Sequence, residues 1–343
     1  MPELPDIELY LHALRPRIGG QRLERALITS PFLLRSVEPR LEDVVGATVV
    51  ALRRLGKRIV WQFDNDLFLV IHLMIAGRFR WKPRGGEAGG AGAVNVGSRL
   101  TRPAKTALAA LEFATGTLTL TEAGSKRRAS IHVVRSEDGL AALDPGGIDV
   151  LAATPEEFGA ALTRENHTLK RALTDPHLLS GIGNAYSDEI LHAARLSPLQ
   201  LTNRLSAEDI TRLHAATVAT LTEWREQLIQ DAGDRFPEKI TAFREGMAAH
   251  GRFGQPCRVC HAPIQRIRYA ANEANYCAVC QTGGRLLADR AMSRLLRQDW
   301  PRSLDELERT LQRAKPDLSG SLAVDGTVTI VFTDIVDSTV MLS

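Results

Sequence analysis

Branched apolar residues gather in short runs between residues 48 and 134, a composition typical of β-strands. These runs predict strands at 48–54, 59–63, 67–73, 108–113, 117–121 and 130–134. Before them, Ile7, Leu11 and Leu14 recur at helical spacing and Pro5 suits a first helical turn, so a helix is predicted over residues 5–15. Residues 82–103 contain six glycines, which we interpret as a flexible insertion between strands.

The pattern becomes helical after the proline and glycines of residues 144–147. Thr154 is followed by a proline and two glutamates, which is typical of a capped helix start. An apolar stripe predicts a long helix over residues 206–228. Residues 169–174 are predicted to be the end of one helix, and another is predicted from 184 to about 195. Strands followed by helices indicate the α+β fold class.

Composition and charge narrow the protein class only slightly. The chain has 343 residues, 44% hydrophobic and 24% charged, which fits a soluble protein of two or three domains. A net charge of +3 permits nucleic-acid binding without arguing for it. No apolar stretch approaches the ~20 residues of a membrane span, and the N-terminus has no signal-peptide pattern. We therefore expect a cytoplasmic location, associated with the nucleoid if the source is bacterial.

Four cysteines form two C-x-x-C pairs separated by sixteen residues: Cys257 with Cys260, and Cys277 with Cys280. Each short loop lets two thiolates point at one ion, so the spacing predicts tetrahedral zinc. The zinc is expected to be single and structural because sulfur fills all four positions. Four unrelated thiols are the alternative, and His261 is interpreted as a surface residue.

Arginines outnumber acids around these cysteines, with a local surplus of five positive charges. A basic patch of this kind is expected for phosphate binding, although a solvated basic face is the alternative. The arginines are Arg252, Arg258, Arg266, Arg268, Arg285, Arg290, Arg294 and Arg297, and the acids are Glu273, Asp289 and Asp299.

Between the two shorter helices, Gly181 and Gly183 free the backbone to approach a partner closely. Exposed N–H groups at the start of the next helix, from Asn184, suit a phosphate oxygen. A tight helical hairpin without a ligand is the alternative interpretation of this segment.

Four blocks together resemble the formamidopyrimidine-DNA glycosylase and endonuclease VIII family, over roughly residues 1–300. The start of the chain resembles the family's catalytic N-terminus, and residues 55–58 its lysine loop. Residues 181–189 resemble its helix–two-turn–helix motif, and residues 257–280 its zinc finger.

This resemblance implies the domain organisation. Residues 1–150 are expected to form an N-terminal catalytic β-sandwich with flanking helices, and residues 151–250 a helical helix–two-turn–helix domain. A four-cysteine zinc finger is expected over 251–287 and a low-order tail over 288–343. The DNA is expected to lie in the cleft between the sandwich and the helical domain.

The resemblance also implies the chemistry. Pro2 becomes N-terminal when Met1 is removed, and its amine, with an ordinary pKa of about 7.7–8.0, is expected to attack C1′ of the sugar. Glu3 is expected to move protons during ring opening, and Lys57 to contact the lesion or a neighbouring phosphate. Taken alone, each residue has a simpler interpretation. Proline after Met1 is a common chain start, Glu3 could be a surface acid, and Lys57 could lie at a solvated, charged strand end.

The expected function is removal of a damaged base, an oxidised one by family analogy, followed by strand cleavage by elimination at the abasic site. The partner is then double-stranded damaged DNA, bound by a monomer with no membrane contact. Arg127, Asn184, Asn272 and Ile75 are the expected DNA-binding residues. A DNA-binding protein of the same fold without catalysis is the main alternative, and it would be favoured if Met1 were retained.

The sequence departs from the family pattern at several positions. Asp6 replaces a longer glutamate, Ile75 a methionine, and Asn272 an arginine that binds phosphate. Ala129 stands where a phenylalanine wedge is common, close to Arg127. Because a small side chain cannot fill the space beside an orphaned base, we expect weak selectivity for the opposite base. The family's lesion-covering loop is hard to match over residues 235–244.

Residues 326–339 resemble the first strand of class III nucleotide cyclase domains, with Asp334 at a metal-binding position. The sequence stops four residues later, without the second metal-binding aspartate or the base-selecting residues. We interpret this segment as a remnant of a fused domain or a truncated gene product, and reject a cyclase function.

Overall fold

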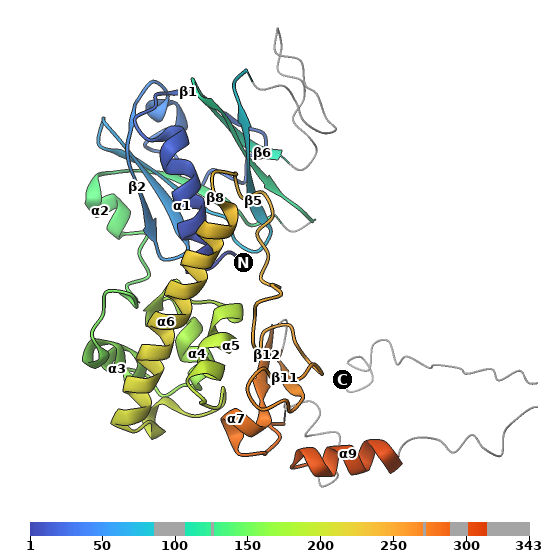
Figure 1. Cartoon of the computed structure of the whole chain (residues 1–343). Coiled ribbons are helices and arrows are strands. Elements are labelled where there is room, and N and C mark those ends of the chain that lie inside the picture. The colour runs from blue at the N-terminus through green and yellow to red at the C-terminus, as the bar shows by residue number, and fades with distance from the viewer. Residues whose placement is uncertain (86–106, 125–126, 270–271, 289–300, 314–343) are drawn as a thin grey trace, which may run out of the picture.

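A β-sandwich, a bundle of helices and a small cysteine-containing hairpin follow one another along the chain in the computed structural model (Figure 1). The structure describes residues 1–85, 107–124, 127–269, 272–288 and 301–313. The helices are α1 (Leu4–Ile18), η1 (Leu41–Val44), α2 (Ser136–Ala141), α3 (Pro155–Thr163), α4 (Leu169–Thr174), α5 (Asn184–Ala193), η2 (Thr202–Arg204), α6 (Ala207–Ala232), α7 (Ala278–Thr282) and α9 (Leu304–Arg313).

The sandwich consists of two four-stranded antiparallel sheets, in the orders β1-β6-β7-β5 and β2-β3-β4-β8. Inward-facing apolar side chains alternate along the strands, as in β7, and form one core. The strands are β1 (Leu23–Ile28), β2 (Val49–Leu55), β3 (Arg58–Phe63), β4 (Leu67–His72), β5 (Gly77–Pro83), β6 (Ala107–Phe113), β7 (Gly116–Glu122) and β8 (Ser130–Arg135).

Most loops that carry candidate functional residues lie at one edge of the sandwich. In the first sheet β1 and β7 end at this edge and β5 begins there, as their antiparallel registers require. In the second sheet β2 and β4 end there, whereas β3 and β8 begin. The loops after residues 28, 55, 72 and 122 therefore lie at a common edge, which we call the loop edge.

Two long helices join the sandwich to the helical part. Helix α1 packs against α6, and α6 runs past both bodies in Figure 1. Leu228 near the end of α6 belongs to the sandwich core, whereas Leu213 and Leu221 belong to the core of the helical part. Ser206 caps α6 by accepting a hydrogen bond from the Asp209 N–H at 3.1 Å.

The helical core also takes residues from outside the helices. Leu4, at the start of α1, and Val150, in the connection from the sandwich, are both fully buried in it. Short strands β9 (Ile148–Asp149) and β10 (Leu179–Ser180) pair in parallel beside this core. The cysteine hairpin consists of β11 (Ile264–Tyr269) and β12 (Asn272–Cys277), paired antiparallel. The first residues of the chain are thus built into the junction of the two bodies.

The six predicted strands and the predicted helices are confirmed, most of them to within a few residues. Strands β1 and β5 and the strands β9 to β12 were not predicted; β1 has little alternation, whereas the alternating charged and apolar residues of β5 are a strand signal that the sequence analysis overlooked. The expectation of low order throughout residues 288–343 is wrong for α9. Its Leu304 and Leu307 pack against Leu286 and Leu287, which supplies the apolar contact that a short helix needs.

Several sequence predictions fall outside the described residues. Most of the glycine-rich segment 82–103 is among them, as is the cyclase-like segment 326–339. Arg290, Arg294 and Arg297 of the predicted basic patch lie there too. Among the described residues, no helix combines the length and the apolar character that crossing a membrane requires.

Candidate active site and metal centre

Glu3 is held by the first turn of helix α5. Its carboxylate accepts three backbone N–H hydrogen bonds, from Gly183 at 2.5 Å, Ala185 at 2.9 Å and Tyr186 at 3.2 Å. The side chain is 3% exposed. The carboxylate therefore occupies the anion site that a helix N-terminus offers, and Glu3 is fixed in position by a segment 180 residues away.

Glycine is required at position 183 for this approach. A Cβ built there would lie 2.5 Å from Glu3 Cδ, far inside van der Waals contact. Gly181 contributes in a second way, because its carbonyl accepts the Leu4 N–H at 3.0 Å and its φ of 90° is in the left-handed region. The glycines predicted to approach a partner closely therefore contact the N-terminus of the same chain.

The chain start is buried among charged groups. Pro2 is buried, and burial lowers the pKa of the Met1 amine. Glu3 and Asp6 oppose this shift, whereas Arg78 and Lys57 add to the lowering. Glu3 and Lys57, both predicted from the sequence, thus act electrostatically on the N-terminal amine, and Pro2 lies between that amine and Glu3.

Lys57 lies on the two-residue turn between β2 and β3, after Gly56 with its φ of 60°. Arg54 braces this turn by donating to the Gly56 carbonyl at 3.2 Å, to Glu8 at 3.1 Å and to Asp149 at 2.8 Å. Burial lowers the pKa of Lys57, and the nearby Glu3 opposes that shift. The turn therefore presents a lysine to the chain start from a rigid support.

Asp6 ties a third segment to the chain start. It accepts the Glu3 backbone N–H at 2.8 Å and a hydrogen bond from Arg244 at 2.6 Å. Burial raises the pKa of Asp6, and the Arg244 guanidinium opposes that rise. Ile240, also in the 235–244 segment, accepts from Arg78 Nε at 2.8 Å. The segment that was hard to match in sequence is thus anchored beside Glu3.

Two of the expected DNA-binding residues are exposed at the loop edge of the sandwich. Ile75 is 62% exposed in the loop after β4, and Arg127 is exposed in the loop before β8. Asn184 opens α5 and is half-buried beside Glu3. The structure does not describe the side chain of Asn272.

Ala129 is buried, and its backbone N–H is bound by a carboxylate at the end of the preceding strand, β7. Glu122, 2% exposed, accepts the backbone N–H groups of Arg128 and Ala129 at 3.0 Å. These bonds turn the loop between β7 and β8 inward at residue 129. Position 129 consequently offers no side chain to a ligand at the loop edge.

His72 is a candidate functional residue that the sequence analysis did not identify. It ends β4 directly opposite Arg58, and its Nε2 is buried without a hydrogen-bond partner. Burial, together with the charges of Arg58, Lys57 and His132, lowers the pKa of His72 to about 4. Its signal in the sequence was weak, because a single histidine in an apolar strand usually indicates packing.

The four cysteines come together as predicted. All four sulfur atoms lie within 4.8 Å of one another, with Cys260 and Cys277 at 3.3 Å and Cys257 and Cys280 at 3.9 Å. Sulfur atoms around a tetrahedral zinc are about 3.8 Å apart, so the cluster fits such an ion. His261 is exposed and is not part of the cluster, which agrees with its interpretation as a surface residue.

Helix α5 also contacts the cysteine cluster, through its other end. His192 Nε2 lies 3.2 Å from Cys257 Sγ, within hydrogen-bond distance. Such a contact orients a metal-ligating thiolate. Sequence spacing could not reveal it, because His192 and Cys257 are 65 residues apart.

Buried charges dock the hairpin on the helices. Asp188 accepts from Lys170 at 2.6 Å and pairs with His250 at 2.7 Å, and Asn275 lies 3.4 Å from it. Glu189 accepts three backbone N–H groups from residues 248–250. Both carboxylates of this network accept hydrogen bonds, so the hairpin has a defined position against α5.

The described part of the basic patch is engaged within the protein. Arg258 donates to the Glu245 carbonyl, Arg266 lies 4.2 Å from the Phe253 ring centre, and Arg268 lies 4.0 Å from Glu273. These contacts hold the three arginines at the protein surface.

The comparisons with known proteins agree with this geometry. Residues 1–127 match the family model of the formamidopyrimidine-DNA glycosylase N-terminal domain, and residues 147–228 match that of its H2TH domain. A formamidopyrimidine-DNA glycosylase of Thermus thermophilus is 30% identical over 293 residues, which cover 83% of this chain and 100% of that protein.

A shorter relative and a solved structure extend the comparison. An uncharacterised formamidopyrimidine-DNA glycosylase-like protein of Mycobacterium tuberculosis is 40% identical over 152 residues, 44% of this chain and 94% of that protein. The structure of Lactococcus lactis Fpg with DNA containing an abasic site has a TM-score of 0.68 and 22% identity, and it matches over 82% of this chain and 99% of that chain.

A sandwich whose N-terminus is fixed on a helix–two-turn–helix unit, beside four clustered cysteines, defines a class of DNA-repair protein. The chain belongs to the formamidopyrimidine-DNA glycosylase family.

Proposed function

We propose that this chain is a base-excision repair enzyme that removes a damaged, oxidised base from double-stranded DNA and then cuts the strand at the abasic site. The supporting observation is the chain start, where buried Pro2 precedes a carboxylate held by three backbone N–H groups. Family membership supports both activities, those of a DNA glycosylase and of an abasic-site lyase.

Pro2 is the proposed nucleophile once Met1 is removed. The lone pair of its nitrogen attacks C1′, and the bond from C1′ to the damaged base breaks as the base leaves and takes up a proton. Glu3 accepts the N–H proton that Pro2 loses, the sugar ring opens to a cationic iminium, and Glu3 passes that proton to O4′.

Strand cleavage follows from the same intermediate. Loss of a C2′ proton expels the 3′ phosphate by elimination, and water then releases the sugar fragment and regenerates the amine. Lys57 is proposed to hold the lesion or an adjacent phosphate near Pro2. Asn184 and Asn272 are proposed phosphate partners, and Ile75 and Arg127 partners of the bases beside the flipped nucleotide.

The cysteine cluster is proposed to hold one structural zinc. Four thiolates leave no open position for water, so the ion would stabilise the hairpin and take no part in the reaction. His192 and the Asp188 network would then hold the hairpin against α5. We propose a monomer bound to one damaged duplex.

Borohydride trapping tests this function. Incubation with abasic-site DNA and borohydride is expected to give a covalent protein–DNA adduct in the wild type. Pro2→Gly, with removal of Met1 verified by mass spectrometry, is expected to lose most of the adduct, because the secondary amine is gone. An undiminished adduct in that variant would show another nucleophile. No adduct in the wild type, with DNA binding intact, would favour the non-catalytic DNA-binding alternative.

A further inference from the structure

A large aromatic side chain stands exposed on a rigid turn at the loop edge. Phe32 is 73% exposed at the third position of the turn 30–33, in which the Leu33 N–H donates to the Ser30 carbonyl at 3.1 Å. Pro31 occupies the second position, which its fixed φ favours. The turn therefore displays the Phe32 ring to solvent.

The turn is anchored on both sides, so the exposure of Phe32 is not the result of a frayed loop. Thr29 donates to the carbonyls of Leu108 at 2.9 Å and, through Oγ1, of Ala107 at 2.7 Å. On the other side, the Leu33 carbonyl accepts the Ile131 N–H at 2.8 Å, and Leu33 itself is 2% exposed. A rigidly held, solvent-exposed aromatic ring is typical of a contact made with a partner.

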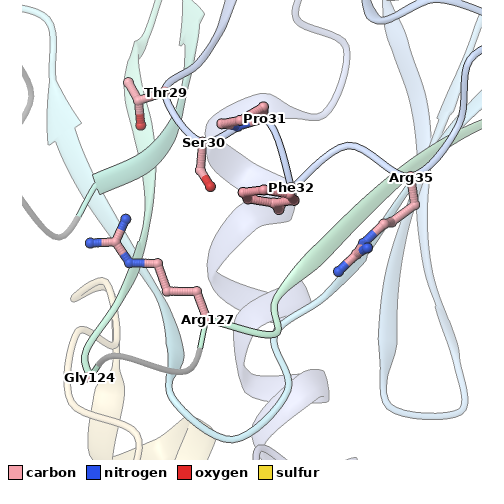
Figure 2. A pocket seen from close by; sticks show the side chains of 7 residues that line it. All are labelled: Thr29, Ser30, Pro31, Phe32, Arg35, Gly124 and Arg127. Atoms are coloured by element: carbon pink, nitrogen blue, oxygen red, sulfur yellow. The ribbon is translucent and has the colours of Figure 1, made fainter.

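The Phe32 ring forms one wall of an open cavity of about 680 Å³. Figure 2 shows the ring between the side chains of Arg127 and Arg35, with the small polar residues of the turn beside it. The seven lining residues are Thr29, Ser30, Pro31, Phe32, Arg35, Gly124 and Arg127. They include two guanidinium groups and no carboxylate.

This combination of groups selects a nucleobase on a DNA strand. An aromatic face stacks on any base, guanidinium groups donate hydrogen bonds to base edges, and positive charge without acids attracts the phosphates. The cavity lies at the loop edge, as do Ile75 and the Lys57 turn.

The position of Phe32 relative to Ala129 strengthens this assignment. Leu34 and Ile131 form a parallel bridge, so Phe32 and Ala129 both lie two residues before the bridged pair. Ala129 is buried and offers nothing to a ligand, whereas Phe32 supplies an aromatic ring from the neighbouring segment.

We propose that Phe32 is a specificity-determining residue whose ring stacks on the base opposite the lesion, while Arg127 reads the edge of that base. This inference rests on the proposed function, because it presupposes a damaged duplex. It also changes the expectation drawn from Ala129: the stacking partner is present, so selectivity for the opposite base is retained.

The test compares Phe32→Ala with Val37→Ala. Val37 is 84% exposed in the same loop and does not line the cavity, which makes it a matched control. Affinity is measured for a duplex carrying a tetrahydrofuran abasic analogue opposite each of the four bases, and for the lesion strand alone. Phe32→Ala is expected to weaken duplex binding by about 5- to 150-fold. It is also expected to reduce the differences in affinity among duplexes with the four opposite bases.

Binding of the single strand and borohydride trapping on single-stranded abasic DNA are expected to stay unchanged in Phe32→Ala. Phe32→Tyr is expected to retain wild-type duplex affinity, because its ring also stacks. Duplex affinities equal to those of Val37→Ala would overturn the proposal. If the wild type gives no trapped adduct at all, the proposed function fails, while the duplex comparison still decides the role of Phe32.

Discussion

Replacing Gly183 with alanine is the sharpest perturbation of the proposed active site. The backbone at this position, φ −130° and ψ −157°, is extended and suits alanine without strain. The added methyl carbon would lie 2.5 Å from Glu3 Cδ, 2.7 Å from Oε1 and 2.9 Å from Cγ. The only large consequence of the substitution is therefore displacement of the Glu3 carboxylate.

The size of the effect follows from these distances. Non-bonded carbons sit at ~3.5–4.0 Å, so the carboxylate has to move by about 1 Å. A displacement of that size in a catalytic group costs roughly 10²-fold in rate. The Gly183 N–H also loses its acceptor, which lowers the free energy of unfolding by about 1–3 kcal/mol. We expect a ~10²-fold slower single-turnover reaction and a modest fall in thermal stability.

The assay is single-turnover base excision, together with strand cleavage at a preformed abasic site and a thermal melt. Gly159→Ala is the control, because its methyl group would lie 2.8 Å from Ile210 Cγ2 in the same helical part, away from Glu3. This control is expected to change stability while keeping the reaction rate. A Gly183→Ala enzyme with wild-type rates would refute the argument that α5 positions Glu3.

Two further predictions concern the metal and the buried histidine. Metal analysis is expected to give about one zinc per chain, and Cys277→Ser is expected to lose the zinc and weaken DNA binding; a metal-free wild type with full DNA affinity would contradict this. His72 is expected to stay neutral down to about pH 4 in an NMR titration. Because the unfolded chain takes up this proton first, near pH 6.5, the free energy of unfolding should fall between pH 6.5 and 4 more steeply in the wild type than in His72→Gln, and equal slopes would contradict the assignment.

Local patterns were sufficient to predict six of the eight strands of the sandwich and most of the longer helices. The apolar residues of β7 alternate along the strand, and those of α6 recur at helical spacing. Both elements were found where expected. Helix α9 was missed because its stability depends on Leu286 and Leu287, whose approach is a tertiary event. The cysteine spacing was the strongest local signal, since short C-x-x-C loops place thiolates together whatever surrounds them.

The sequence indicated Pro2, Glu3 and Lys57 as members of the candidate site, but it indicated neither His72 nor the contacts between distant segments. The sequence indicated that Gly181 and Gly183 approach a partner, and it indicated a role for Glu3. It could not indicate that Glu3 itself is bound by the first turn of α5, because such pairings depend on contacts between distant segments. The same limit hid the contact between His192 and Cys257, and the exposed ring of Phe32.

The pairing of Glu3 with α5 also has a consequence in time. Glu3 is among the first residues to leave the ribosome, and Gly183 is added 180 residues later. At ordinary rates of synthesis of ~5–20 residues per second, the carboxylate waits about 10–40 seconds for its binding site. Until then the Glu3 carboxylate lacks the backbone N–H groups that hold it in the folded protein. A nascent chain that stops before residue 183 holds all eight strands of the sandwich, yet it cannot fix the carboxylate of its active site.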